Sequence, residues 1–215
     1  MKVVERDYVG YKNRPVPTML IRNEEKTKKL AIIMPGLGYT TKAPLLHYSS
    51  RILSNHSYDV LEIQYQYNKK DAQTWSDEEF NEAMRYDINT VIDKVLLEND
   101  YDEFCLVGKS IGTIGLSYLV SRDIFINARC IWFTPLIKRH DVFTAMNASK
   151  QNALCFIGDH DPHYNYDKIE QIKENTFISS VTIPKVNHSL EYDDNILKSI
   201  ETLQMIMNTV ENFTR

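Results

Sequence analysis

The segment that most constrains the fold of this chain runs from residue 103 to 115 and reads EFCLVGKSIGTIG. A short apolar run ends at Gly108, and small and apolar residues at helical spacing follow Gly112. Between them stands Ser110, in the pattern G-x-S-x-G. Glycines on both sides relieve crowding around a residue held in a strained backbone conformation. The segment therefore predicts a strand, a very tight turn and a helix, with a serine at the apex of the turn.

The positions of the other glycines point to the same kind of architecture. The chain contains only seven glycines, and all but Gly10 stand in or near the ends of apolar runs. Because a chain that uses glycine sparingly keeps it where backbone geometry requires it, these positions predict tight turns at the carboxyl ends of parallel strands. In open parallel sheets, ligands bind outside those ends.

Short apolar runs without strict alternation recur along the chain, which is typical of strands buried on both faces. They lie at residues 30–34, 60–63, 104–107, 130–133, 153–157 and 181–184. Helical patterns lie between them at residues 43–54, 77–98, 111–121, 141–148 and 167–174, and an amphipathic helix at 195–213 closes the chain. Strands that alternate with helices predict a three-layer α/β sandwich, with a mostly parallel sheet and helices on both faces.

The first 22 residues follow a different pattern. Residues 3–8 and 18–21 predict an antiparallel pair at the edge of the sheet, with Pro15 and Pro17 in the connection between the two strands. No Pro-, Gly- or Ser-rich stretch divides the 215 residues, which favours a single domain over residues 1–215.

Charge and composition exclude several classes of function. A net charge of −4 argues against affinity for nucleic acid. No apolar run reaches the roughly 18 residues that a membrane span needs, and the N-terminus becomes charged at Glu5, so we expect no membrane partner, no signal peptide and a cytoplasmic location.

The three cysteines, Cys105, Cys130 and Cys155, lie inside apolar runs, which predicts buried reduced thiols and neither a disulfide nor a metal site. We expect no cofactor.

A serine at a tight turn is a weak nucleophile unless a base removes its proton and a third group orients the base. The apolar run at residues 153–157 is followed by GDHDPHYN, and the last run is followed by KVNHSLEY. An aspartate and then His188 therefore follow Ser110 along the chain. This order of serine, acid and histidine differs from the orders in chymotrypsin and subtilisin.

From about residue 30 to the C-terminus, these motifs resemble those of the α/β-hydrolase family, and most of all its compact, lidless members, the dienelactone hydrolases and small serine esterases. In that family the acid often stands in a G-x-x-D pattern, which here selects Asp161. The resemblance implies an α/β-hydrolase fold, with Ser110 as nucleophile, His188 as general base and Asp161 as orienting acid. It also implies an oxyanion hole made by the backbone N–H groups of Leu37 and Ile111.

Some residues depart from the family pattern or allow other interpretations. Pro35 stands where many relatives carry histidine, which argues against the lipases with an HGGG motif, and Thr113 stands where a second glycine is frequent. Asp159 is the alternative to Asp161, and with His160 and His163 it also resembles a metal cluster, although such alternating polar residues are more often turn residues. A phosphate-binding loop would need a glycine at position 103, which is Glu.

Features around the expected site suggest a small substrate. Many α/β-hydrolases carry a lid after the sixth strand, and here residues 134–139 leave no room for a sizeable one. We expect an open, shallow pocket bounded by Tyr39, the segment QYQYNKKDAQTW and the loop TPLIKRHD, with Tyr65, Tyr67 and Trp75 either lining the pocket or packing the loop.

The expected function is that of a carboxylesterase-like serine hydrolase, whose partner is a small-molecule ester. Amide, peptide or lactone hydrolysis uses the same residues and stays an alternative. So does a non-enzymatic or slow-turnover protein that binds a small molecule, because a fold does not determine function.

Overall fold

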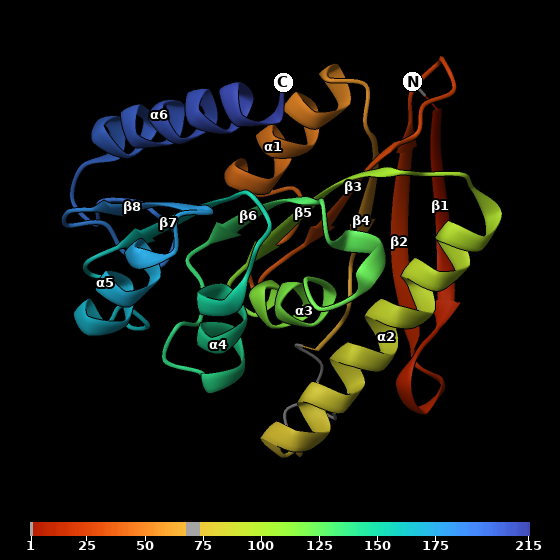
Figure 1. Ribbon diagram of the computed structural model, residues 1–215, viewed down its shortest axis with the longest axis horizontal. Helices are drawn as coiled ribbons and strands as arrows, with labels where there is room; N and C mark the ends of the chain where they lie inside the picture. Colours follow the sequence, from red (N-terminus) through yellow and green to blue (C-terminus); the bar gives the residue numbers. More distant parts are fainter. Residues whose placement is uncertain (1, 68–73) are drawn as a thin grey trace.

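A computed structural model describes residues 2–67 and 74–215 (Figure 1). Within them, eight strands form one sheet in the order β1-β2-β4-β3-β5-β6-β7-β8. The strands are β1 Lys2–Val9, β2 Pro15–Arg22, β3 Lys29–Met34, β4 Asp59–Ile63, β5 Glu103–Lys109, β6 Arg129–Phe133, β7 Ala153–Gly158 and β8 Ile178–Ile183. β3 to β8 are parallel, whereas β2 is antiparallel to both of its neighbours, β1 and β4. The predicted mostly parallel sheet with an antiparallel N-terminal edge is confirmed.

Helices cover both faces of this sheet. They are α1 Pro44–Asn55, α2 Asp77–Glu98, α3 Gly112–Leu119, α4 His140–Ala148, α5 Tyr166–Glu174 and α6 Ile196–Thr214. α1 and α6 lie on one face and α2 to α5 on the other, so the three predicted layers are present (Figure 1). No helix within residues 2–67 and 74–215 is long and apolar enough to cross a membrane.

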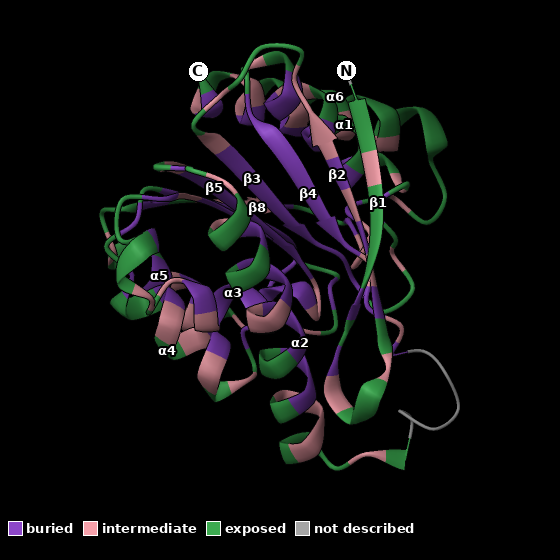
Figure 2. Cartoon of the chain, turned by 90° about the vertical axis from the view of Figure 1, so that its right-hand side faces the viewer, coloured by how far each residue is buried: buried purple, intermediate pink, exposed green. Residues whose placement is uncertain are grey.

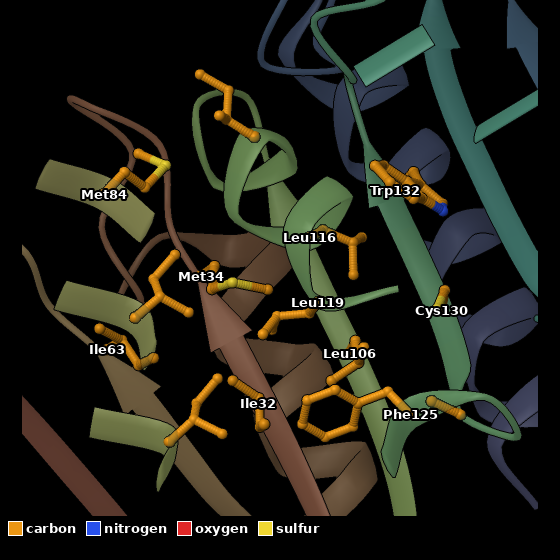
Figure 3. Packing of buried hydrophobic residues seen from close by; sticks show 14 of the residues in the cluster. Ile32, Met34, Ile63, Met84, Leu106, Leu116, Leu119, Phe125, Cys130 and Trp132 are labelled. Carbon is orange, nitrogen blue, oxygen red and sulfur yellow. The ribbon is translucent and has the colours of Figure 1, made fainter. Parts of the chain in front are cut away.

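The core consists of two apolar clusters, one on each face of the sheet. The central strands β3 and β4 are almost wholly buried, whereas the edge strand β1 is largely exposed (Figure 2). On the side of α2 to α5, Ile32 and Leu106 of the sheet pack in one cluster with Leu116 and Leu119 of α3 (Figure 3). Because the central strands are buried on both faces, their sequences lack strict alternation, which is the pattern that predicted them. The three cysteines are buried and unpaired, as expected.

The prediction for Pro15 and Pro17 is wrong: both lie inside β2, not in the connection. The backbone oxygen of Pro17 accepts a hydrogen bond of 2.8 Å from the N–H of Gln64. The backbone polar groups of Pro17, and of Pro15 two residues before it, therefore point toward β4 and away from β1. The pairing of β2 with β4 starts only at Thr18. The missing N–H groups of the two prolines therefore remove no hydrogen bond from the β1–β2 ladder, and both prolines lie at the start of β2, before its pairing with β4 begins, which is where strands tolerate proline.

β8 also begins earlier than its apolar pattern predicts. The expected strand covered residues 181–184, whereas the structure has Ile178–Ile183. β8 is the outermost strand of the sheet, and its additional residues include Ser179 and Ser180. A strand at an edge needs less apolar sequence than a central one, so its first residues carry little signal.

Gly112 allows α3 to approach β3 without a gap. A Cβ atom at this position would clash with the backbone oxygen of Met34 and would lie 2.9 Å from the backbone oxygen of Pro35. We expect Gly112→Ala to lower the free energy of unfolding by about 1–3 kcal/mol, the usual cost of overpacking, as measured by urea denaturation. Gly38→Ala is the matched control, because a Cβ atom there would meet nothing within 4 Å, and its effect should stay within about 0.5 kcal/mol. Equal effects in the two variants would contradict this close approach.

Candidate active site

Ser110 lies at the carboxyl end of β5 in a backbone conformation that few residues other than glycine adopt. Its φ is 54°, in the left-handed region. Two backbone hydrogen bonds hold it there: its N–H donates to the oxygen of Phe133 at 3.1 Å, and its own oxygen accepts from the N–H of Thr113 at 2.9 Å. The G-x-S-x-G segment thus forms the predicted strand, tight turn and helix, with the serine side chain at the carboxyl edge of the parallel sheet.

His188 stands between Ser110 and Asp161 and contacts both. Its Nε2 lies 2.8 Å from Ser110 Oγ, and its Nδ1 lies 2.7 Å from Asp161 Oδ2. The Asp161 side chain is fully buried, whereas the His188 side chain is 30% exposed. The structure therefore brings together the three side chains that the sequence analysis selected. Asp161 is buried, whereas Ser110 and His188 are partly exposed to solvent.

Asp161 and His188 meet because the loops after β7 and β8 lie directly against each other. Gly158 makes this possible, since a Cβ atom there would clash with the backbone oxygen of Val186 in the histidine loop. The second carboxylate oxygen of Asp161 accepts a hydrogen bond of 2.7 Å from the N–H of His163. Both oxygens of the carboxylate are thus engaged, which fixes its orientation toward the imidazole.

Asp159, the alternative acid, makes its hydrogen bond to a backbone group away from His188. Its Oδ1 accepts a hydrogen bond of 2.6 Å from the N–H of Lys185, in the turn after β8, and its side chain is 38% exposed. Lys185 itself has a positive φ of 64°. Asp159 therefore stabilises a turn, and the structure gives it no contact with His188.

The histidines near Asp159 do not form a metal cluster with it. The ring of His163 packs 5.2 Å from the ring of His188, centroid to centroid. Burial lowers the pKa of His163 below its ordinary value, which favours the neutral form of its ring beside His188. In the part of the chain that the structure describes, no three His, Cys, Asp or Glu side chains are placed to hold a metal ion.

Leu37 and Ile111, the expected donors of an oxyanion hole, flank the serine. Gly36 packs so closely on it that a Cβ atom at Gly36 would lie 3.3 Å from the Cβ of Ser110. Leu37 follows in the same turn and is 48% exposed, and Ile111 caps the N-terminus of α3. Neither backbone N–H donates a hydrogen bond to another residue in the ranges 2–67 and 74–215. Both groups are therefore available to a ligand.

Lys109 is a residue whose place the sequence analysis missed. The sequence analysis gives it no role, yet it is buried, and its Nζ donates to the hydroxyl of Thr134 and to the backbone oxygen of His188. The available signal was a charged residue at the end of an otherwise apolar strand.

The tyrosines after β4 pack the loop and do not line the site. The hydroxyl of Tyr65 donates to the backbone oxygen of Pro35, and that of Tyr67 donates to Asp87 at 2.7 Å, while the two rings stack 4.9 Å apart. Trp75 packs edge-on against Tyr11. Residues 68–73 of the same segment lie outside the described residues. The interval between β6 and α4, where relatives insert a lid, is only residues 134–139.

No family model matches the sequence, and no curated protein matches it either. Solved structures do match over nearly the whole chain. A protein of unknown function from Agrobacterium tumefaciens is 18% identical with a TM-score of 0.74, over 98% of this chain and 94% of its own. A lidless α/β serine hydrolase from Xanthomonas campestris is 15% identical with a TM-score of 0.69, over 100% and 94%. A cold-adapted esterase from an Arctic intertidal metagenomic library is 13% identical with a TM-score of 0.71, over 99% and 94%.

These likenesses, together with the strand order and the turn at Ser110, show that the chain has the α/β-hydrolase fold. At this level of identity they show the fold alone. A shared fold does not determine the reaction, which depends on the residues of the site.

Proposed function

We propose that this protein is a serine hydrolase that cleaves small esters through an acyl-enzyme. The observation that carries the proposal is the continuous row of hydrogen bonds from Ser110 through His188 to Asp161, with distances of 2.8 and 2.7 Å. A serine hydroxyl, an imidazole and a buried carboxylate in this order are the parts that nucleophilic acyl transfer needs. The esterase and the serine hydrolase among the similar folds support the same reaction class.

In the first half of the proposed reaction, Ser110 Oγ attacks the ester carbonyl while His188 Nε2 removes the hydroxyl proton. Asp161 holds the Nδ1–H of His188, which keeps Nε2 free to accept that proton and stabilises the imidazolium that forms. His188 then gives the proton to the departing alcohol, and the acyl group stays on Ser110. In the second half, water repeats the attack with His188 as base and releases the acid.

The negative charge that develops on the carbonyl oxygen needs fixed donors. We assign this role to the backbone N–H groups of Leu37 and Ile111, because both lie next to Ser110 and have no partner among the described residues. Ile111 also stands at the N-terminus of α3, where the helix dipole favours negative charge.

The short interval after β6 favours small substrates. A cavity of about 210 Å³ lies beside Tyr39, between α1 and α6, but neither Ser110 nor His188 lines it. A long acyl chain would thus leave apolar surface in water, and each methylene left there forfeits about 0.8 kcal/mol, nearly a factor of four in transition-state binding.

The experiment compares kcat/KM for p-nitrophenyl acetate, butyrate, octanoate and palmitate. We expect an optimum at two to four acyl carbons. A rise in kcat/KM up to palmitate would contradict the prediction of an open site and would show that the acyl chain is buried on binding. No turnover with any of the four esters would contradict the proposed esterase activity.

A further inference from the structure

One buried ammonium group joins the loops that build the candidate site. Lys109 is the last residue of β5, directly before Ser110, and only 1% of its surface is exposed. Its Nζ donates to Thr134 Oγ1 at 2.6 Å and to the backbone oxygen of His188 at 2.7 Å, and it lies 5.0 Å from the centre of the Tyr39 ring. These three partners come from the loops after β6, β8 and β3, so Lys109 ties three loops to the strand that carries the serine.

The first partner, Thr134, is itself strained. Its φ of 41° lies in the left-handed region, where a β-branched residue is a genuine outlier. The residue is held there by a hydrogen bond of 2.7 Å from its N–H to the oxygen of Phe156, and its buried hydroxyl points at Lys109. Strain of this kind persists only where the surroundings fix it, and it concentrates at functional sites.

Burial of the Lys109 ammonium group is unfavourable compared with burial of an apolar side chain. Removing it from water is unfavourable unless the charge is paired and its hydrogen bonds are made, and an apolar side chain of similar length would fill the same volume without that cost. The buried charge of Lys109 lies where its second hydrogen bond reaches the backbone oxygen of His188. That location favours a role in geometry over a role in stability.

We propose that Lys109 is a positioning residue, which fixes the imidazole of His188 at the right distance from Ser110 by holding the backbone oxygen of His188. The proposal rests on the function proposed above. Without this bond the loop after β8 lacks its tether to β5, and a displacement of the imidazole by about 1 Å can cost on the order of a hundredfold in rate.

The charge of Lys109 should change within the range in which the enzyme can be assayed. Burial lowers its pKa from 10.5 to about 8, and the nearby carboxylates act in the opposite direction. The titratable groups that face it come from the loops after β3, β7 and β8, and they are Tyr39, Asp161, His163, His188 and Glu191. Because a charged donor makes the stronger hydrogen bond, the tether weakens when Lys109 loses its proton. We expect kcat to fall by roughly fivefold with a midpoint near pH 8.

The expected fall in kcat can be told apart from alkaline unfolding, because the loss of the proton from Lys109 does not lower the free energy of unfolding. Between pH of about 8 and 10.5, folded Lys109 binds fewer protons than the same residue in the unfolded chain. Its contribution to the free energy of unfolding therefore rises with pH across this window, while kcat falls.

The test compares Lys109→Met with Lys168→Met as a matched control. Lys168 also donates to two backbone oxygens, those of Ile137 and Lys138 at 2.9 and 3.2 Å, but not to the histidine loop. We expect Lys109→Met to lower kcat by about 10- to 100-fold with KM within about threefold, and to lack the inflection near pH 8. Lys168→Met should keep the wild-type kcat and the inflection.

A second measurement is independent of turnover. The proton of His188 Nδ1, hydrogen-bonded to Asp161, should give a far-downfield NMR signal in the wild-type protein and in Lys168→Met, and Lys109→Met should lose or shift it. A variant Lys109→Met with wild-type kcat and an unchanged signal would overturn the proposal. If that variant does not fold, the wild-type pH profile decides, because a flat kcat between pH 7 and 9.5 also overturns it. Absence of turnover in the wild-type protein would instead refute the esterase function and would leave the NMR comparison valid.

Discussion

Replacing Ser110 by alanine should lower esterase turnover by a factor on the order of a million, because nucleophile, base and acid act as a unit and the loss of one removes the work of all three. The fold should survive, since within residues 2–67 and 74–215 the side chain of Ser110 makes its hydrogen bond only to the partly exposed His188. Turnover of p-nitrophenyl butyrate gives the magnitude, and circular dichroism checks the fold.

A fluorophosphonate probe tests the same residue directly. We expect it to label the wild-type protein at Ser110, as located by peptide mapping, and to leave Ser110→Ala unlabelled. Ser189→Ala is the demanding control, because Ser189 follows His188 in the same loop and is partly exposed. Labelling of any other serine in the wild-type protein would contradict the assignment of the nucleophile.

The second large effect is expected at Asp161. Asp161→Asn should lower kcat by roughly four orders of magnitude with the fold intact. The amide that replaces the carboxylate carries no negative charge to stabilise the imidazolium. If its NH₂ group faces His188, it also stabilises the tautomer whose Nε2 already carries a proton and cannot accept one from Ser110.

Asp159→Asn is the control for that change, two residues away in the same loop. Its side-chain oxygen can still accept the hydrogen bond from the N–H of Lys185, so the turn after β8 should keep its form and kcat should stay within about threefold of the wild type. A larger loss in Asp159→Asn than in Asp161→Asn would transfer the role of orienting acid to Asp159.

Much of the fold could be predicted because its elements have strong local patterns. The central strands, such as β3 and β5, are buried on both faces and therefore read as unbroken apolar runs, and α2 has the same bounds, Asp77–Glu98, in the prediction and in the structure. The prediction failed at the edges of the sheet. There the sequence placed Pro15 and Pro17 in the connection, although they lie in β2 before its pairing with β4 begins, and Ser179 and Ser180 near the start of β8 carry no apolar signal.

The sequence by itself determined the order of strands and helices, the turn that presents Ser110 and the sequence of serine, acid and histidine, because each depends on residues that are neighbours in the chain. Only the tertiary structure decided which carboxylate reaches the imidazole. Asp159 and Asp161 follow the same strand two residues apart, and the contact with His188 depends on how the loops after β7 and β8 pack at Gly158. The tether from Lys109 to the backbone of His188 joins residues 79 positions apart, and its burial appears only when the sheet and its loops close around it.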